Sequence, residues 1–444
     1  MNIEETLDGL YFLGENIFYE KYGDMVYARD TAAQKDYLFT ETAYDYLRHF
    51  SKERAVSGES VAELVKKEYA VADDTEFFKD AKGFFEYLID NRIIVPALNS
   101  GKTDKIKTAA LIDEVRSYCM EHKILQSVEL ELTYRCNEKC IHCYVDNFTP
   151  DQKELSLSEY KSFLLEVRKM GCLSVLLTGG EVCMKHEWLD IAEFASSIGM
   201  LVDIYTNGLA LTDEIFDRIR SIHPSSVSYS LYGGTKAVHD AVTGVPGSFD
   251  KTIKSIMMTK CAGIDTYIKT VVIKENADDL APLLKLAERI GVDVNPSYTI
   301  FDSYGGKYKG AHMLDTEKDY INVMKICRRY APEDNIRGRR DIKGKVCRAG
   351  LSSLSMDPYG NVYVCISLRR SIGNIRNKSI REIWQHSEYL SKIRSLRFCD
   401  LCHKSAECLY KDNCSICFAR IDLDNIKIPD DICMRARAAW YTQH

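Results

Sequence analysis

The chain has 444 residues, a net charge of −6, and contents of 45% hydrophobic and 28% charged residues, a composition typical of a globular protein with several domains. The charges are mixed, with no basic face that would indicate nucleic-acid binding, and no apolar run could span a bilayer. The acidic N-terminus carries no secretion signal, so we expect a cytoplasmic protein whose sixteen cysteines stay reduced and bind metal rather than form disulfides.

Residues 1–98 are expected to form a small separate unit. Strands are predicted near 17–23, 25–30 and 36–40, where β-branched and aromatic residues flank a glycine turn. Amphipathic helices are predicted near 41–50, 58–70 and 74–91. The polar stretch that follows predicts a linker over residues 99–125.

Residues 126–310 alternate regularly between strands and helices, which predicts an α/β fold of parallel strands with helices outside. About six such units are too few to close an eight-fold barrel, so we expect a partial (β/α)6 TIM barrel. Ligands of such folds bind at the C-terminal ends of the strands. A helical, basic bridging region is expected at 311–345. The strands are expected at 127–134, 174–181, 201–208, 225–234, 265–273 and 293–301.

The segment CNEKCIHC follows the first of these strands and carries Cys136, Cys140 and Cys143. Three thiols on one loop can hold an iron–sulfur cluster that keeps one iron free for another ligand; a surface zinc site is the alternative. The spacing resembles the signature of radical S-adenosylmethionine (SAM) enzymes. That resemblance implies a [4Fe-4S] cluster on these thiols, whose open iron binds the amino and carboxylate groups of SAM.

The resemblance also implies residues that contact SAM. In TGGE, at the end of the second strand, glycines would let the backbone approach the ligand, and Glu181 would accept a hydrogen bond from the SAM ammonium. Polar residues at the other strand ends can equally be caps and turns. The segment HDAVTGVPGSFDKT, from His239, also resembles the peptide-maturase branch of this family. The expected SAM contacts are His142, near the adenine, with Gly179, Gly180, Glu181, Thr206, Asn207, Ser230 and Lys269.

Residues 346–444 carry eight cysteines in a pattern that resembles the SPASM extension of radical SAM enzymes. The pattern departs after Cys408: Asp412 stands at an expected cysteine, and Cys414 and Cys417 follow. Eight thiols suffice for two auxiliary [4Fe-4S] clusters, and so for three clusters in the chain; two structural zinc sites are the alternative. We assign Cys347, Cys365 and one or both of Cys414 and Cys417 to one cluster, and Cys399, Cys402, Cys408 and Cys433 to the other.

Residues 1–98 resemble the PqqD-like, winged-helix-like domain that recognises precursor peptides; an unrelated accessory domain is the alternative. In that class the leader of the peptide adds to the third strand as an extra strand. The resemblance therefore implies a maturase that cleaves SAM reductively, abstracts a hydrogen from a leader-bound ribosomal peptide and forms a thioether or carbon–carbon crosslink. Its electrons would come from a flavodoxin or ferredoxin.

Two other functions stay open. Anaerobic sulfatase maturases normally carry Asp after the cysteine that matches Cys365, where this chain has Ile366. A non-catalytic iron–sulfur electron carrier would need no open iron. The catalytic base is not assigned: Asp203, Asp240, Asp302 and Tyr304 are candidates that the sequence does not distinguish. The other cysteines, expected to be idle thiols, are Cys119, Cys172, Cys183, Cys261 and Cys327.

Overall fold

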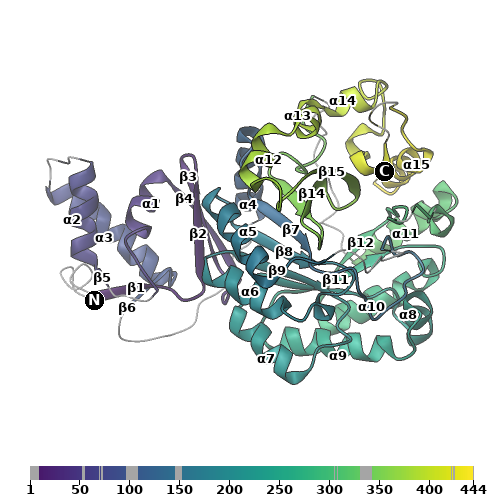
Figure 1. Cartoon of the computed structure of the whole chain (residues 1–444), viewed down its shortest axis with the longest axis horizontal. Helices are drawn as coiled ribbons and strands as arrows, with labels where there is room; N and C mark the ends of the chain where they lie inside the picture. The colour runs from purple at the N-terminus through teal and green to yellow at the C-terminus, as the bar shows by residue number, and fades with distance from the viewer. Residues whose placement is uncertain are drawn as a thin grey trace. The chain divides into compact units, whose positions relative to one another are not determined.

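The computed structural model describes residues 10–52, 56–69, 71, 74–96, 109–145, 153–304, 306–307, 309–330, 343–421, 423 and 426–443. The chain divides into two compact units, Met1–His122 (unit 1) and Lys123–His444 (unit 2) (Figure 1). Within the described ranges, every helix is too short or too polar to cross a membrane.

Unit 1 contains two small antiparallel sheets and the three helices that the amphipathic pattern predicts. One sheet has the order β2 (Ile17–Tyr22), β3 (Met25–Asp30), β4 (Lys35–Thr40), and the other β5 (Val56–Ser57), β1 (Leu10–Leu13), β6 (Ile94–Pro96). The apolar faces of the helices and strands form one core that includes Val26, Leu47, Val65, Phe85 and Leu88. The helices are α1 (Glu41–Leu47), α2 (Gly58–Glu68) and α3 (Asp74–Asp90).

Part of the stretch expected as a linker is helical. Helix α4 (Ala109–His122) contacts β2 and β4, and its residues Val115 and Cys119, four positions apart, are buried. The polar composition that precedes the helix hid this amphipathic segment, and that polar part, residues 97–108, lies outside the described residues.

Unit 2 confirms the partial barrel. Six parallel strands stand in chain order, and the helices between them lie on the outer side of the sheet (Figure 1). The strands are β7 (Ser127–Glu131), β8 (Ser174–Thr178), β9 (Leu201–Thr206), β10 (Ser226–Ser230), β11 (Thr266–Val271) and β12 (Asp293–Ser297). The helices are α5 (Leu157–Lys169), α6 (Trp188–Ser197), α7 (Asp213–Ile222), α8 (Lys236–Thr243), α9 (Ser248–Cys261) and α10 (Leu280–Ile290).

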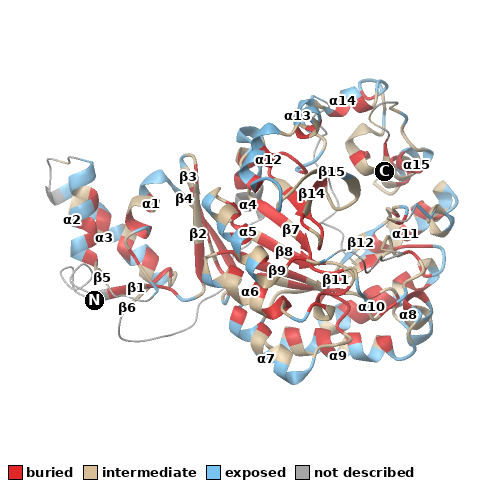
Figure 2. Ribbon diagram, viewed as in Figure 1, coloured by how far each residue is buried: buried red, intermediate tan, exposed pale blue. Residues whose placement is uncertain are grey.

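The C-terminal region extends the barrel sheet instead of standing apart from it. Strand β13 (Ser353–Met356) pairs in parallel with β7, and β14 (Asn361–Cys365) and β15 (Leu368–Asn374) follow as an antiparallel hairpin. One hydrophobic core includes Val128 of β7 and Ala436 of α15. Strands β7 to β10, β13 and β14 are largely buried, whereas β12 and β15, at the two edges of the sheet, contain no buried residue (Figure 2). The remaining helices are α11 (Glu317–Tyr330), α12 (Ile380–His386), α13 (Glu388–Ser395), α14 (Phe398–Leu401) and α15 (Asp430–Tyr441).

Candidate cofactor and substrate site

The cysteine loop begins where β7 ends and is held against the TGGE turn by the main chain. The Gly180 N–H donates to the Thr133 carbonyl at 2.8 Å, and the Glu181 N–H donates to the Arg135 carbonyl at 3.0 Å. A Cβ atom at Gly180 would stand 2.5 Å from the Arg135 carbonyl oxygen, far inside van der Waals contact. From the sequence we expected Gly180 to let the backbone approach a ligand. In the structure, Gly180 lets the TGGE turn approach the backbone of the cysteine loop.

The other side of the loop is supported by the HDAVTGVPGSFDKT segment. The Lys139 N–H donates to the Thr243 carbonyl at 2.9 Å, and the Ile141 N–H donates to the Val242 carbonyl at 3.0 Å. Asp240 accepts hydrogen bonds from the Gly247 N–H and the Phe249 N–H, which fixes the turn into α9. This segment, whose role the sequence left without a physical account, thus holds the cysteine loop in place.

The three thiols of the loop lie close to one another. Burial raises the pKa of Cys140 well above its usual value, and Glu138, Cys143 and Cys136 lie near enough to raise it further. Nowhere in the described ranges do three His, Cys, Asp or Glu side chains converge as ligands of a single metal ion. A cubic cluster instead distributes its thiolates over different irons, so neighbouring thiols on one loop fit it.

Glu181 connects the second and third strand ends. Its side chain is 2% exposed, and it accepts hydrogen bonds from the Thr206 hydroxyl at 2.6 Å and the Asn207 N–H at 2.7 Å. The side-chain amide of Asn207 donates to the side-chain oxygen of Asn137, inside the cysteine loop, at 2.6 Å. The structure therefore brings Glu181, Thr206 and Asn207 together beside the loop, with their polar groups bonded to the protein.

His142 lies in an aromatic setting at the end of the loop. Its ring meets the Tyr232 ring edge-on, with centroids 4.6 Å apart, and the hydroxyl of Ser230 lies within reach of the Tyr232 hydroxyl. Burial lowers the pKa of His142 to about 4, with His312 and Lys309 lowering it further, so the ring is neutral at pH 7. Its Nδ1 is buried without a hydrogen-bond partner among the described residues. A neutral ring with an open nitrogen fits a bound heteroaromatic base.

Lys269 lies inside the barrel, in register with Ser230 of the neighbouring strand. Its amine stands 4.2 Å from the centre of the Tyr205 ring. Burial lowers the pKa of Lys269, while Glu129 and Asp203 raise it. The described interactions of the Lys269 amine are thus with side chains of the barrel strands.

A buried polar network that the sequence reasoning missed joins the barrel to β15. Glu131, 1% exposed at the end of β7, accepts hydrogen bonds from the Tyr304 hydroxyl and the Arg369 guanidinium, each at 2.8 Å, and from the Tyr134 hydroxyl at 3.0 Å. Burial raises the pKa of Glu131 to about 7, although Arg369 lowers it. The signal of this network in the sequence was the alternation of acidic and apolar residues in the strand segment VELE, residues 128–131.

The late thiols fall into two groups. Burial raises the pKa of Cys365 to about 11, and Glu129, Cys417 and Cys347 lie near enough to raise it further. Burial likewise raises the pKa of Cys433, and Cys402 and Cys408 add to that shift.

Two cysteines have looser links to these groups. Cys399 lies on α14, three residues before Cys402, and its thiol donates to Asp400 at 3.8 Å. Cys414 is buried, and in the sequence it lies between Cys408 of one group and Cys417 of the other. Cys417 thus lies near Cys347 and Cys365, and Cys433 lies near Cys402 and Cys408. The assignment of these thiols to two clusters stays a prediction.

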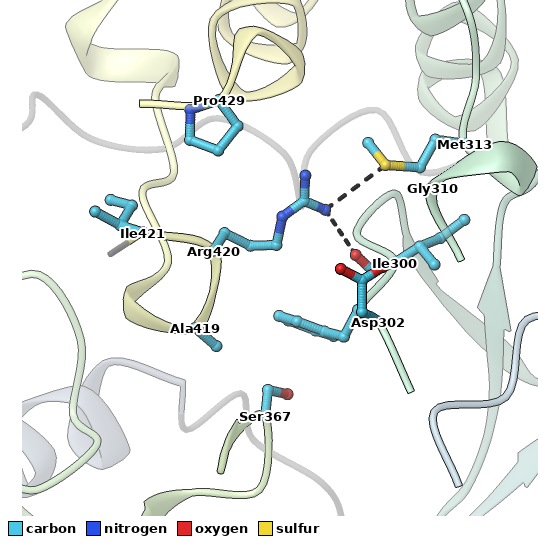
Figure 3. A pocket seen from close by; sticks show the side chains of 10 residues that line it. Ile300, Asp302, Gly310, Met313, Ser367, Ala419, Arg420, Ile421 and Pro429 are labelled. Carbon is cyan, nitrogen blue, oxygen red and sulfur yellow. Dashed lines mark hydrogen bonds between the residues drawn. The ribbon is translucent and has the colours of Figure 1, made fainter. Parts of the chain in front are cut away.

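A cavity of about 450 Å³ lies between the loop after β12 and the late-cysteine region (Figure 3). Its walls carry Ile300, Asp302 and Met313 on one side, and Ser367 and Arg420 on the other. Ser367 is two residues beyond Cys365, and Arg420 is three residues beyond Cys417. The cavity therefore adjoins the first group of late thiols.

The four candidate bases have different surroundings. Asp240 caps α9, and Asp203 accepts from the Ser226 hydroxyl at 2.6 Å inside the sheet. Tyr304 donates to Glu131, and burial raises its pKa far above the usual value. Asp302 alone among the four lines the cavity.

The five scattered cysteines have different exposures. Cys119, Cys172 and Cys327 are buried, as expected of idle thiols. Cys183 is half-buried and Cys261 is exposed.

Comparison with known proteins identifies two domains. Residues 130–287 match the radical SAM superfamily, and residues 347–417 match the SPASM iron–sulfur cluster-binding domain. The AdoMet-dependent heme synthase of Methanosarcina barkeri is 28% identical over 65% of this chain and 90% of its own length. The subtilosin biosynthesis protein AlbA of Bacillus subtilis is 23% identical over 89% of this chain and 88% of its own. Streptococcus suis SuiB, solved with its precursor peptide SuiA, has the same fold, with a TM-score of 0.62 at 16% identity, over 92% of this chain and 96% of SuiB.

Proposed function

Because the chain is a radical SAM enzyme with a SPASM domain, we propose that it is a maturase that forms a thioether or carbon–carbon crosslink in a ribosomally made precursor peptide. The observation that carries this proposal is the extent of the matches. Unit 1 makes up more than a quarter of the sequence, so matches to AlbA and SuiB over about nine-tenths of the chain extend into it. AlbA is named for bacteriocin biosynthesis, and SuiB binds a precursor peptide.

Unit 1 offers a surface that suits an extended peptide, and we assign residues 1–98 as the PqqD-like recognition domain. Within the described part of unit 1, β4 pairs with β3 on one side and with no strand on the other. A cavity of about 390 Å³ opens beside β4, lined by Phe39, Phe84 and Tyr87 among others. A leader would add to β4 through its backbone and place an apolar side chain among these rings. The Phe39 ring packs edge-on against both Phe84 and Tyr87.

The cysteine loop and its neighbours would hold the cofactors. Cys136, Cys140 and Cys143 would carry the SAM-binding [4Fe-4S] cluster, and the two groups of late thiols would carry two auxiliary clusters. When bound, SAM and its cluster supply the carbon radical that abstracts hydrogen from the peptide; a flavodoxin or ferredoxin would provide the electron.

The residues of the chain orient these groups. Gly180 and Thr243, through their backbones, set the path of the cysteine loop, and His142 offers a neutral ring to the adenine of SAM. Glu181 accepts from the Thr206 hydroxyl and from the Asn207 and Cys183 N–H groups, and the Cys183 thiol also lies within hydrogen-bond reach. The SAM ammonium would replace that weak S–H donor with a charged one. Three clusters on reduced thiols would suit an enzyme of the cytoplasm, where thiols are kept reduced.

A second candidate is a radical SAM enzyme that acts on a tetrapyrrole. The identity to AdoMet-dependent heme synthases favours it, at 28% over 65% of the chain. That match leaves about a third of the sequence without a counterpart. A peptide maturase accounts for more of the molecule.

The test is a mass spectrum of an anaerobic reaction. The full chain, reconstituted with iron and sulfide, is mixed with SAM, dithionite and a synthetic peptide. The sequence of this peptide is the one encoded by the short reading frame beside the gene of the enzyme. Loss of two hydrogens per crosslink, with 5'-deoxyadenosine formed, is the expected result. Deoxyadenosine formation with an unchanged peptide, but with conversion of an iron porphyrin offered in parallel, would favour the second candidate.

A further inference from the structure

The walls of the cavity in Figure 3 are linked to both thiol regions of unit 2. The segment that carries Ile300, Asp302 and Met313 is bonded to the cysteine loop: the Tyr304 N–H donates to the Tyr144 carbonyl at 2.8 Å. Lys309 adds a bond from its amine to the Ile141 carbonyl at 3.3 Å. The opposite wall follows directly on Cys365 and Cys417. A group in this cavity would therefore lie between the SAM-binding loop and the first group of late thiols.

The positive charge that lines this cavity, the guanidinium of Arg420, already has partners in the protein. Arg420 donates to the Ile300 carbonyl at 2.6 Å and to the Met313 sulfur at 3.7 Å, the two bonds drawn in Figure 3. Its other terminal nitrogen pairs with Asp431 at 2.8 Å. Arg420 thus joins the two walls, and it shares the Asp431 carboxylate with Arg435, which lies 3.2 Å from it.

The negative charge that lines the cavity, the carboxylate of Asp302, is not paired with a cation within the described residues. Asp302 is exposed, and its Oδ1 accepts from the Lys309 N–H at 2.9 Å. No hydrogen bond or ion pair to its Oδ2 occurs within the described residues. Ile366, next to Cys365, provides no carboxylate from the opposite wall. We propose that Asp302 is the proton acceptor in the bond-forming step, a role that rests on the proposed maturase function.

The step balances as follows. After one hydrogen atom has left the peptide, its carbon radical bonds to the sulfur of a thiol side chain, and the S–H bond breaks. The proton goes to the Asp302 carboxylate. An iron–sulfur cluster held by Cys347, Cys365 and Cys417 would supply the acceptor for the remaining electron. If the partner is an aromatic carbon, its C–H proton leaves by the same route. The peptide loses two hydrogens in either case.

The test compares Asp302→Asn with the wild type. The amide keeps an oxygen for the Lys309 N–H but cannot accept a proton. We expect crosslinking to fall by about 100-fold or more, because positioned acid–base groups contribute that much, while deoxyadenosine formation stays within about threefold. Asp302→Glu should restore part of the crosslinking. The control is Asp315→Asn, which removes an exposed carboxylate paired with Lys274 outside the cavity.

A second readout needs no turnover. Carboxyl groups of the reconstituted wild type, with SAM and no reductant, are labelled by carbodiimide and an amine, with and without the same synthetic peptide. The peptide should protect Asp302 and leave Asp315 labelled. Crosslinking by Asp302→Asn at the wild-type yield per deoxyadenosine, or an unprotected Asp302, would overturn the inference while the maturase function stands. A wild type that forms deoxyadenosine without changing the peptide would overturn both.

Discussion

The two cysteine-rich regions of unit 2 are organised by different means. Cys136, Cys140 and Cys143 lie on one short loop whose backbone is bonded to the TGGE turn and to Val242 and Thr243. The late thiols come from segments far apart in sequence, such as Cys347 and Cys417. Between residues 398 and 421 the described elements are α14 and two single 3₁₀ turns.

This difference shows where each region obtains its order. A loop at the end of a parallel strand takes its shape from the sheet and from main-chain hydrogen bonds, so it is set before any cofactor binds. The main-chain hydrogen bonds of the late-cysteine segment are local turns, such as Cys402 N–H to the Phe398 carbonyl and Cys408 N–H to the Lys404 carbonyl. Such turns do not fix the path of a long segment, so ligation of a cluster would close it. We therefore expect the first region to determine chemistry and the second to depend on iron for its stability. Four predictions test this contrast.

The largest effect is expected from a thiol of the first region. Cys140→Ala should lower 5'-deoxyadenosine formation by more than about 100-fold, because changes that only surround a metal ligand already cost 10–100-fold. Cys417→Ala should leave SAM cleavage within about tenfold of the wild type and abolish crosslinking. Chromatography of both products measures this. Cys261→Ala, at an exposed thiol, is the control. Equal loss of SAM cleavage in both variants would refute the contrast.

Iron removal should loosen the second region selectively. In the chelated protein, amides of residues 399–421 should exchange with solvent at least about 100-fold faster than in the reconstituted protein, because their backbone hydrogen bonds are local turns and not part of a sheet. Amides of β7 to β10 should keep their protection. Hydrogen exchange followed by mass spectrometry measures both. Uniform deprotection of the barrel strands would show that the first region also needs its cluster to be ordered.

Gly180→Ala should damage the preorganised loop. The added methyl would meet the Arg135 and Tyr134 carbonyl oxygens at 2.5 and 2.7 Å, and we expect a cost of about 2–3 kcal/mol together with lower iron content. Gly263→Ala is the comparison: its φ is +78° but nothing lies within 4 Å, so backbone strain alone should cost only about 1 kcal/mol. Gly180 has no positive φ, so its cost would come from the close approach. Thermal unfolding and iron analysis report the result. A cost at Gly180 no larger than at Gly263 would mean that the loop carbonyl groups move aside for the methyl group.

The smallest effect concerns Glu131, which joins the strand before the loop to the hairpin that bears Cys365. Its pKa is raised in the folded state from 4.5 to about 7, so the folded protein holds the proton more tightly. This contribution favours folding at low pH and is lost as the pH rises from about 4.5 to about 7.

The measurement is therefore the pH dependence of the stability difference between the wild type and Glu131→Gln. Between pH 5 and 8 the wild type should lose roughly 2 kcal/mol relative to the variant, since each pKa unit corresponds to about 1.4 kcal/mol. Parallel curves for the two proteins would show that Glu131 stays ionised throughout this range.

What the sequence determined by itself was local. Thiol spacing, turn glycines and the alternation of strands and helices are properties of consecutive residues, and they predicted the partial barrel and the place of the cysteine loop at its strand end. Helix α4 escaped because a polar stretch precedes it.

Only the tertiary structure decided which distant residues meet. Glu131 and Arg369 are 238 positions apart, and no local spacing relates them. The pairing of β13 with β7 brings them together and adds the late strands to the barrel sheet. The same packing placed Cys417 with Cys347 and Cys365, made the cysteine loop the neighbour of Gly180, and gave Asp302 a cavity wall while Asp240 became a helix cap. Such contacts arise when buried surfaces pack against one another, which a reading along the chain does not contain.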